Sequence, residues 1–274
     1  MFAGIDIGST TSKVVLIGED CKILAFSLIP TGFDRNKSGE EVLERALKQV
    51  GKTRKSIKYI VSTGYGRRSF ERANKVLPEI ICHAKGTKFL YPETRTIIDI
   101  GGQDSKVIQL DGDGRVLKFE MNDKCAAGTG RFFEVLTERI LNISLDELGP
   151  LSLKSKNSFI LSSICTVFAE SEIISFLSSG VPVEDIADGM HKAVAKRVIS
   201  MARSGQIPFD EQILFSGGVA KNVGVVKAFE ELLGKKVIPV ENPQSTGALG
   251  AALFAKEAFE EVSAQRMANG FAGS

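Results

Sequence analysis

Short apolar runs alternate with glycine-rich polar turns in two separate parts of the chain. In each part an apolar run enters a turn of Gly, Ser, Thr and Asp, a second run leaves it, a Gly/Asp turn follows, and a third run returns. Apolar runs of this length, bounded by turn residues, are typical of β-strands joined by hairpins. The pattern therefore predicts two similar three-stranded β-meanders.

Elsewhere the apolar residues recur every three or four positions, which indicates helices that bury one face. The predicted helices cover 39–50, 68–74, 131–141, 170–177, 182–204 and 247–262. Two further strands are predicted at 59–62 and 212–215. The tail 263–274 is rich in Gly, Ala and Ser, and we expect it to be frayed and flexible.

The two meanders are an internal repeat with an offset of 93 positions. Asp6–Gly8 aligns with Asp99–Gly101, and Ser12–Val14 aligns with Ser105–Val107. The alignment continues without a gap into the third strand of each meander. A chain that contains one supersecondary unit twice is expected to fold as two related lobes.

We therefore predict an α/β protein with a first lobe at 1–93 and a second lobe at 94–246. The predicted final helix, 247–262, packs back on the first lobe. A cleft between two lobes is a common place for a ligand, so the repeat directs attention to the turns that would face such a cleft.

Composition narrows the class of protein. The chain has 274 residues, of which 43% are hydrophobic and 25% charged, and its formal net charge is +2. With no strongly one-signed segment, we expect no nucleic-acid partner. The uncharged stretch 157–169 is shorter than the ~20 residues of a membrane span, and the N-terminus lacks the pattern of a signal peptide. We expect a cytoplasmic protein without a membrane partner.

The turn of each meander carries residues that suit a nucleotide. Near Asp6, glycines allow close approach, and hydroxyl and backbone N–H groups can face phosphate oxygens. The Asp6 carboxylate can hold Mg²⁺ through water. A single turn of this kind is typical of an ordinary hairpin as well as of a nucleotide site. The second copy of the turn favours the nucleotide site, and it adds the carboxylate of Asp99. That copy also has Gln103 and Asp104, which can orient an attacking water.

A third segment, Phe215–Asn222, has a predicted strand that ends in Gly217 and Gly218 before a helical segment. Paired glycines at this place suit close contact with an adenosine, and an ordinary strand-to-helix turn is the alternative. No GxxxxGK[ST] loop or GxGxxG fingerprint occurs, so the P-loop and dinucleotide-binding classes lack their signatures.

At these three segments the chain resembles the superfamily of sugar and acetate kinases, actin and heat-shock chaperone ATPases. In that superfamily two phosphate loops and an adenosine motif occur in the same order. The resemblance implies two ribonuclease-H-like lobes with Mg-ATP between them.

Four cysteines are widely spaced without a CxxC pair, so free thiols or metal ligands are expected rather than disulfides. Cys125 and Cys165 each precede a predicted helix, where the helix dipole favours the thiolate that ligates iron. A buried free thiol is the alternative for either residue. Cys21 is interpreted as structural, and Cys82 has no predicted ligand role.

The strings NDKCAAGTGRF, CTVFAESE, STGYGR and DIGGQDSK closely resemble the activators of 2-hydroxyacyl-CoA dehydratases and the related ATPase subunits of benzoyl-CoA reductases. By position, this resemblance implies phosphate contacts from Ser9, Thr10, Thr11, Ser12, Lys13 and Gln103. It implies adenosine contacts from Gly217, Gly218 and Gln244, and iron ligation by Cys125 and Cys165. His83 and His191 are interpreted as ordinary polar residues.

The resemblance implies a homodimer with one bridging 4Fe-4S cluster, in which both cysteines of each protomer are ligands. It implies that ATP hydrolysis drives one electron from ferredoxin or flavodoxin into an iron-sulfur acceptor. That acceptor is a 2-hydroxyacyl-CoA dehydratase, a double-cubane cluster protein or an aromatic acyl-CoA reductase. The alternative is a cluster-free small-molecule kinase of the same superfamily.

Overall fold

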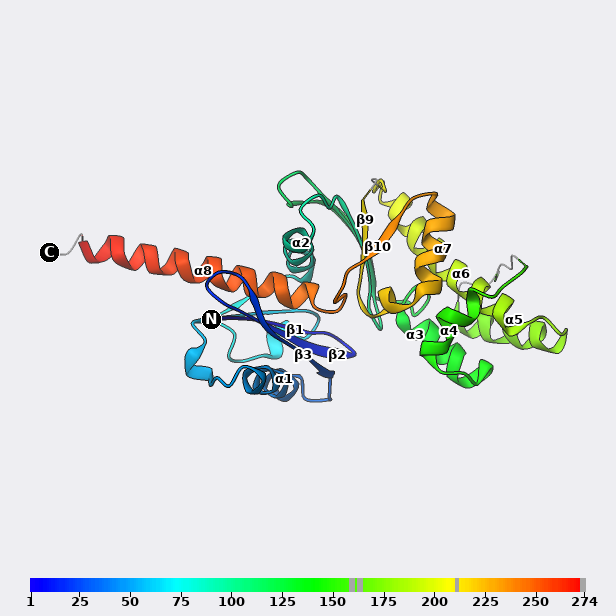
Figure 1. Cartoon of the computed structure of the whole chain (residues 1–274), viewed down its shortest axis with the longest axis horizontal. Coiled ribbons are helices and arrows are strands. Elements are labelled where there is room, and N and C mark those ends of the chain that lie inside the picture. The colour runs from blue at the N-terminus through cyan, green and yellow to red at the C-terminus, as the bar shows by residue number, and fades with distance from the viewer. Residues whose placement is uncertain (158–160, 162–164, 210–211, 272–274) are drawn as a thin grey trace. The chain divides into compact units, whose positions relative to one another are not determined.

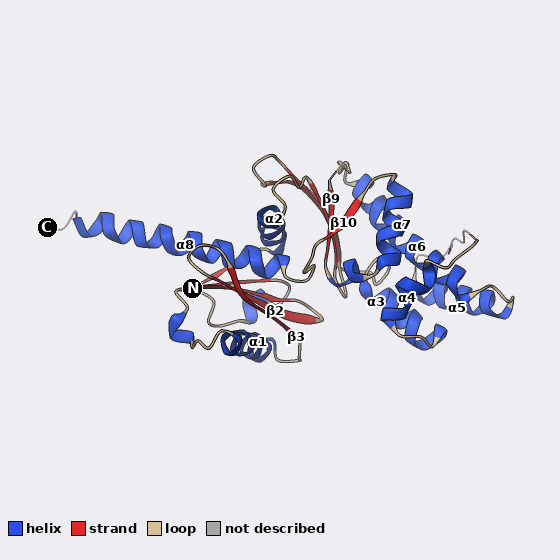
Figure 2. Cartoon of the chain, viewed as in Figure 1, coloured by secondary structure: helices blue, strands red, loops and turns tan. Residues whose placement is uncertain are grey.

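The computed structural model describes residues 1–157, 161, 165–209 and 212–271. The chain forms two α/β units, which are drawn in Figures 1 and 2. The first unit consists of Met1–Pro92 and Gln244–Ser274, and the second of Glu93–Pro243. The chain therefore leaves the first unit once and returns to it for its last helix.

Each unit is built on one five-stranded sheet, with the strand orders β3-β2-β1-β4-β5 and β10-β9-β6-β7-β8. The strands are β1 (Phe2–Ile7), β2 (Thr11–Ile17), β3 (Ile23–Pro30), β4 (Tyr59–Thr63), β5 (Lys75–Val76), β6 (Thr96–Ile100), β7 (Ser105–Leu110), β8 (Val116–Asn122), β9 (Ile213–Ser216) and β10 (Val237–Pro239). The described helices are α1 (Arg35–Gln49), α2 (Glu79–Leu90), α3 (Gly130–Leu136), α4 (Leu145–Ser152), α5 (Thr166–Ser178), α6 (Val183–Ser204), α7 (Val223–Leu233) and α8 (Thr246–Phe271). None of these helices combines the length and apolar character that crossing a membrane requires.

The two predicted meanders are confirmed, and they share even their irregularities. β1, β2 and β3 pair antiparallel, as do β6, β7 and β8, and the next strand beside β1 or β6 is parallel to it. The pairing of the second and third strands is interrupted at Leu16/Ile17 and at Gln109/Leu110. These are the same positions of the 93-residue repeat. The sequence repeat is thus a structural duplication.

In the first unit the sheet is buried on both faces. Alternate residues of a strand point to opposite faces, so Ile5 and Ile7 share a core with α1 while Phe2 lies in a second core with α8. The second core contains many alanines of α8, among them Ala248 and Ala252. Such small side chains let α8 lie close to β1 and to α2, with which it packs (Figure 1).

In the second unit, Ile98 and Ile100 of β6 and Ile213 and Phe215 of β9 share one large core with α3, α6 and α7. Its largest fully buried side chains are Phe132, Phe133, Phe215 and Phe229. Phe215 of β9 and Phe229 of α7 pack edge to face, with ring centroids 5.4 Å apart. This packing fixes α7 directly behind the segment that follows β9.

Two predicted helices, 68–74 and 247–262, differ from the structure, and two observed helices, α2 and α4, were not predicted. The expected helix 68–74 is a short 3-10 turn, Arg67–Ser69, followed by β5, because pairing of β5 with β4 extends the chain here. Helix α2 was not predicted because it buries His83, Gly86 and Thr87 together with apolar residues, so its sequence has no clear apolar stripe. Helix α8 begins near the expected residue but continues to Phe271, through most of the predicted tail 263–274.

Candidate functional site

The glycine-rich turn between β1 and β2 is held in shape from the end of β3. The Gly8 N–H donates to the Thr11 carbonyl (3.0 Å), and Thr31 Oγ1 donates to the Gly8 carbonyl (3.0 Å). The buried Ser12 hydroxyl lies 2.8 Å from Thr31 Oγ1, so Ser12 helps to hold Thr31 against the turn. The other small polar residues predicted to meet phosphate are partly or fully exposed: Ser9, Thr10 and Thr11.

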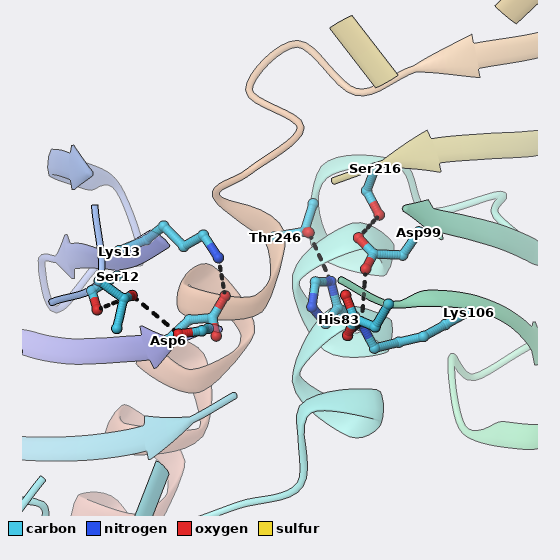
Figure 3. A network of polar contacts seen from close by, with 11 residues as sticks. Asp6, Ser12, Lys13, His83, Asp99, Lys106, Ser216 and Thr246 are labelled. Atoms are coloured by element: carbon cyan, nitrogen blue, oxygen red, sulfur yellow. Dashed lines mark hydrogen bonds and ion pairs between the residues drawn. The ribbon is translucent and has the colours of Figure 1, made fainter. Parts of the chain in front are cut away.

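Asp6 lies near the end of β1 and opposite Lys13 on β2. The Asp6 Oδ2 and Lys13 Nζ atoms are 3.2 Å apart, and the two side chains are only 7% and 14% exposed. An ion pair that is shielded from water in this way is stronger than one at the surface. Lys13, which the resemblance assigns to phosphate, therefore contacts the Asp6 carboxylate (Figure 3).

The same pair occurs in the second copy. Lys106 Nζ lies 3.2 Å from Asp99 Oδ2 and 2.5 Å from Asp104 Oδ2, and its side chain is 3% exposed. Ser216 Oγ donates to Asp99 Oδ1 at 2.7 Å, as Figure 3 shows. Lys106 was missing from the predicted site, although the repeat aligns it with Lys13. The structure thus brings Asp99 and Asp104 together on one lysine.

The second turn is also hydrogen-bonded to the start of α3. The backbone N–H groups of Gly130 and Arg131 donate to the carbonyls of Gly101 and Gly102, at 2.9 and 2.8 Å. Gln103 stands next to these two glycines and is exposed. A movement of the turn that carries Gln103 would therefore be transmitted to the first residues of α3.

Gly217 makes the turn in the predicted adenosine segment, directly after β9. Its φ angle is +86°, and its N–H donates to the Pro243 carbonyl at 2.8 Å. A Cβ atom at this position would lie 2.2 Å from the Ile100 carbonyl oxygen, so only glycine fits. Gly218 starts a short 3-10 turn, and the half-buried Gln244 directly follows Pro243 in the chain.

Gly217→Ala is expected to lower the free energy of unfolding by about 3 kcal/mol, because left-handed strain and overpacking add up. Gly234→Ala is the matched control. Gly234 also has a positive φ angle, +63°, but a Cβ there would contact nothing within 4 Å. We expect the control to lose only about 1 kcal/mol. Chemical denaturation measures both, and equal losses would contradict the close approach to Ile100.

Asn222 ends the adenosine segment and caps α7. Its Oδ1 accepts the N–H groups of Gly224 and Val225, so its Nδ2 must be the donor to His191 Nε2, 3.0 Å away. Burial lowers the pKa of His191 to about 3, which keeps the ring neutral and able to accept. The sequence pattern indicates an ordinary polar residue at His191 and no particular role for Asn222. Both support the adenosine segment from within the unit.

Cys125 and Cys165 differ in their local structure. Asn122 holds the Cys125 loop: its Nδ2 donates to the carbonyls of Cys125 and Ala127, at 2.8 and 3.0 Å. Cys165 is exposed and is the N-cap of α5, as expected, whereas Cys125 is half-buried in the loop between β8 and α3. The preceding Ser162–Ile164 lie outside the described residues.

The other two cysteines lie in the first unit. Cys82 is fully buried on α2, and burial raises the pKa of its thiol to about 12, so it remains a thiol. Cys21 is half-buried in the turn before β3 and has a positive φ angle of 62°. Among the described residues, no three His, Cys, Asp or Glu side chains are grouped closely enough to hold a metal ion.

Residues 3–255 match the model of the BadF/BadG/BcrA/BcrD ATPase family. The chain is 48% identical over 263 residues to the 2-hydroxyisocaproyl-CoA dehydratase activator of Clostridioides difficile, covering 94% of this chain and 97% of that relative. It is 44% identical over 256 residues to the (R)-2-hydroxyglutaryl-CoA dehydratase activating ATPase of Acidaminococcus fermentans, covering 92% and 95%. These similarities extend over nearly the whole chain.

Solved structures agree with the sequence comparison. The activator of the 2-hydroxyisocaproyl-CoA dehydratase from Clostridium difficile with bound ADPNP superimposes with a TM-score of 0.90 at 46% identity, over 97% of this chain and 98% of that one. A ROK family glucokinase from Streptomyces griseus, in complex with glucose and AMPPNP, gives 0.56 at 14% identity, over 93% and 99%. The glucokinase shares the fold alone. The predicted α/β fold, which a sugar kinase shares, is confirmed.

Proposed function

The chain belongs to the BadF/BadG/BcrA/BcrD ATPase family, and from this premise we propose that it is a reductive activator. It couples ATP hydrolysis to the transfer of one electron into a partner iron-sulfur enzyme. The observation that carries the proposal is the near full-length similarity to proteins named as dehydratase activators. We propose a 2-hydroxyacyl-CoA dehydratase or a double-cubane cluster protein as the acceptor, and ferredoxin or flavodoxin as the donor.

The proposed nucleotide is Mg-ATP. The exposed hydroxyl and N–H groups of the first turn, Ser9–Thr11, bind phosphate oxygens, and the strand-end carboxylates of Asp6 and Asp99 hold Mg²⁺ through water. Gln103 and Asp104 orient the attacking water. Gly217, Gly218 and Gln244 are the proposed adenosine contacts. The ADPNP bound in the related activator structure supports a nucleotide site of this kind.

The donor set of the second unit fits an iron-sulfur cluster shared by two protomers. Cys165 is exposed and Cys125 is half-buried, whereas Cys82 is fully buried in the first unit. Two thiols from each of two copies complete the four ligands of a 4Fe-4S cluster, which supplies one-electron redox chemistry when bound. Beside Cys165, the apolar side chains of Val167 and Phe168 are 69% and 67% exposed. Exposed apolar groups of this size support a protein contact at this end of α5.

Coupling between nucleotide and cluster is proposed to pass through α3. The Gly101 and Gly102 carbonyls hold the first residues of α3, which follow the Cys125 loop in the chain. A change at the turn next to Gln103 would therefore shift the backbone that carries one proposed iron ligand. This arrangement lets ATP hydrolysis alter the surroundings of the transferred electron without a separate signalling element.

Purification without oxygen tests the proposal against a small-molecule kinase. We expect a brown dimer with broad visible absorption that bleaches in air. A colourless protein that transfers phosphate stoichiometrically to a metabolite would identify a kinase instead. To find the acceptor, the brown dimer is incubated with native extract and ADP plus aluminium fluoride. An iron-sulfur protein should be enriched over the nucleotide-free control.

A further inference from the structure

His83 is a polar side chain that the proposed mechanism does not yet use. It lies on α2, and the residue is only 8% exposed. Its Nδ1 is 3.0 Å from the hydroxyl oxygen of Thr246, the first residue of α8, which is fully buried (Figure 3). These residues are 163 positions apart in the sequence, so the contact joins two separate helices of the first unit.

The place of the His83 ring is set by an unusually close helix contact. A Cβ atom at Gly86 of α2 would lie 2.1 Å from the Thr246 carbonyl oxygen. A Cβ atom at Gly250 of α8 would lie 1.8 Å from the Cys82 carbonyl oxygen. The two backbones therefore touch close to His83 on both sides of it along α2.

His83 and Asp6 both lie close to Gly247, in the first turn of α8. A Cβ atom at Gly247 would lie 3.0 Å from His83 Nε2 and 3.2 Å from Asp6 Oδ2. The Asp6 carboxylate thus lies against the backbone of Gly247 on one side and meets Lys13 on another. Strand β1 and helices α2 and α8 converge here, so a shift of the first turn of α8 would change the surroundings of the Asp6 carboxylate.

We infer that His83 is a positioning residue: through Thr246 it holds the first turn of α8 against Asp6, and so fixes the Asp6 carboxylate for Mg²⁺ bound to the nucleotide. The inference rests on the proposed function, in which Asp6 serves the metal. Outer partners that orient a metal-binding carboxylate commonly change metal affinity strongly when they are removed.

Two variants of His83 distinguish the roles of its two ring nitrogens. The amide of Asn reaches the position of Nδ1 and can keep the hydrogen bond to Thr246, whereas the amide of Gln reaches toward Nε2. We expect His83→Asn to bind ADP with Mg²⁺ within about twofold of the natural protein, and His83→Gln, His83→Ala and Thr246→Val to bind about tenfold more weakly. The double variant His83→Ala/Thr246→Val should be no weaker than either single variant.

Calorimetric titration of the full-length dimer with ADP, once with Mg²⁺ and once with a chelator, is the test. A role in positioning Asp6 predicts that only the Mg²⁺-dependent affinity falls. General damage to the unit would weaken both affinities and would overturn the inference. Equal failure of His83→Asn and His83→Ala would also overturn it, because the bond to Thr246 would then not be the cause.

Asp6→Ala distinguishes this inference from the function on which it rests. If Asp6→Ala loses Mg²⁺-dependent affinity while all His83 variants keep it, the inference fails and the nucleotide site stands. If Asp6→Ala binds Mg-ADP like the natural protein, the proposed role of Asp6 fails, and the role of His83 fails with it.

Discussion

Cys125→Ala and Cys165→Ala are each expected to remove the cluster iron and to abolish electron transfer. In a symmetric dimer either change deletes two of the four thiolates that a 4Fe-4S cluster requires. The proposed dimer should weaken as well, because the shared cluster would join its protomers. Nucleotide affinity should stay within about twofold, since neither thiol is part of the proposed nucleotide site. Iron analysis, light scattering and nucleotide titration measure the three effects.

Cys21→Ala is the matched control for these variants. Cys21 is half-buried and belongs to the first unit, whereas Cys125 and Cys165 belong to the second. The control should keep its iron and its dimer. If Cys125→Ala or Cys165→Ala kept the iron content of the control, that residue would not be a ligand.

The fold could be predicted because the sequence contains the same three-stranded unit twice. Asp6 and Asp99 occupy equivalent strand ends, and Lys13 and Lys106 equivalent positions on the next strand, so one copy corroborates the other. Neither turn alone separates a phosphate site from an ordinary hairpin. Cys165 was also placed correctly, because the start of a helix depends on local sequence.

The supporting residues could not be predicted, since their roles depend on contacts between distant segments. His83 meets Thr246 across 163 positions, and His191 meets Asn222 across 31. Thr31 closes the first turn from the end of β3. Helix α2 was not predicted because polar and small residues are buried on it together with apolar ones. Local periodicity reports which face of an element is apolar, but it does not report which distant element will cover that face.

Gln103→Ala is expected to slow ATP hydrolysis by roughly 10²-fold while nucleotide affinity changes little. The exposed side chain of Gln103 lies in a turn whose backbone is fixed by α3, so its loss removes a group that orients water without disturbing the turn. Single-turnover phosphate release gives the rate, and calorimetry gives the affinity.

Gln49→Ala, at the exposed end of α1, is the control for loss of a surface glutamine. It should hydrolyse ATP at the natural rate. Natural turnover in Gln103→Ala would remove the second turn from the catalytic site. A matched loss of affinity and rate would assign Gln103 to binding rather than to hydrolysis.

We propose that ATP hydrolysis drives an electron from this protein into its acceptor. The most direct measurement is the anoxic rate of electron transfer from the reduced dimer to a purified 2-hydroxyacyl-CoA dehydratase, with ATP, with a non-hydrolysable analogue and without nucleotide. Of these three conditions, we predict sustained electron transfer only in the one with ATP. Equally fast transfer without nucleotide would contradict the claim.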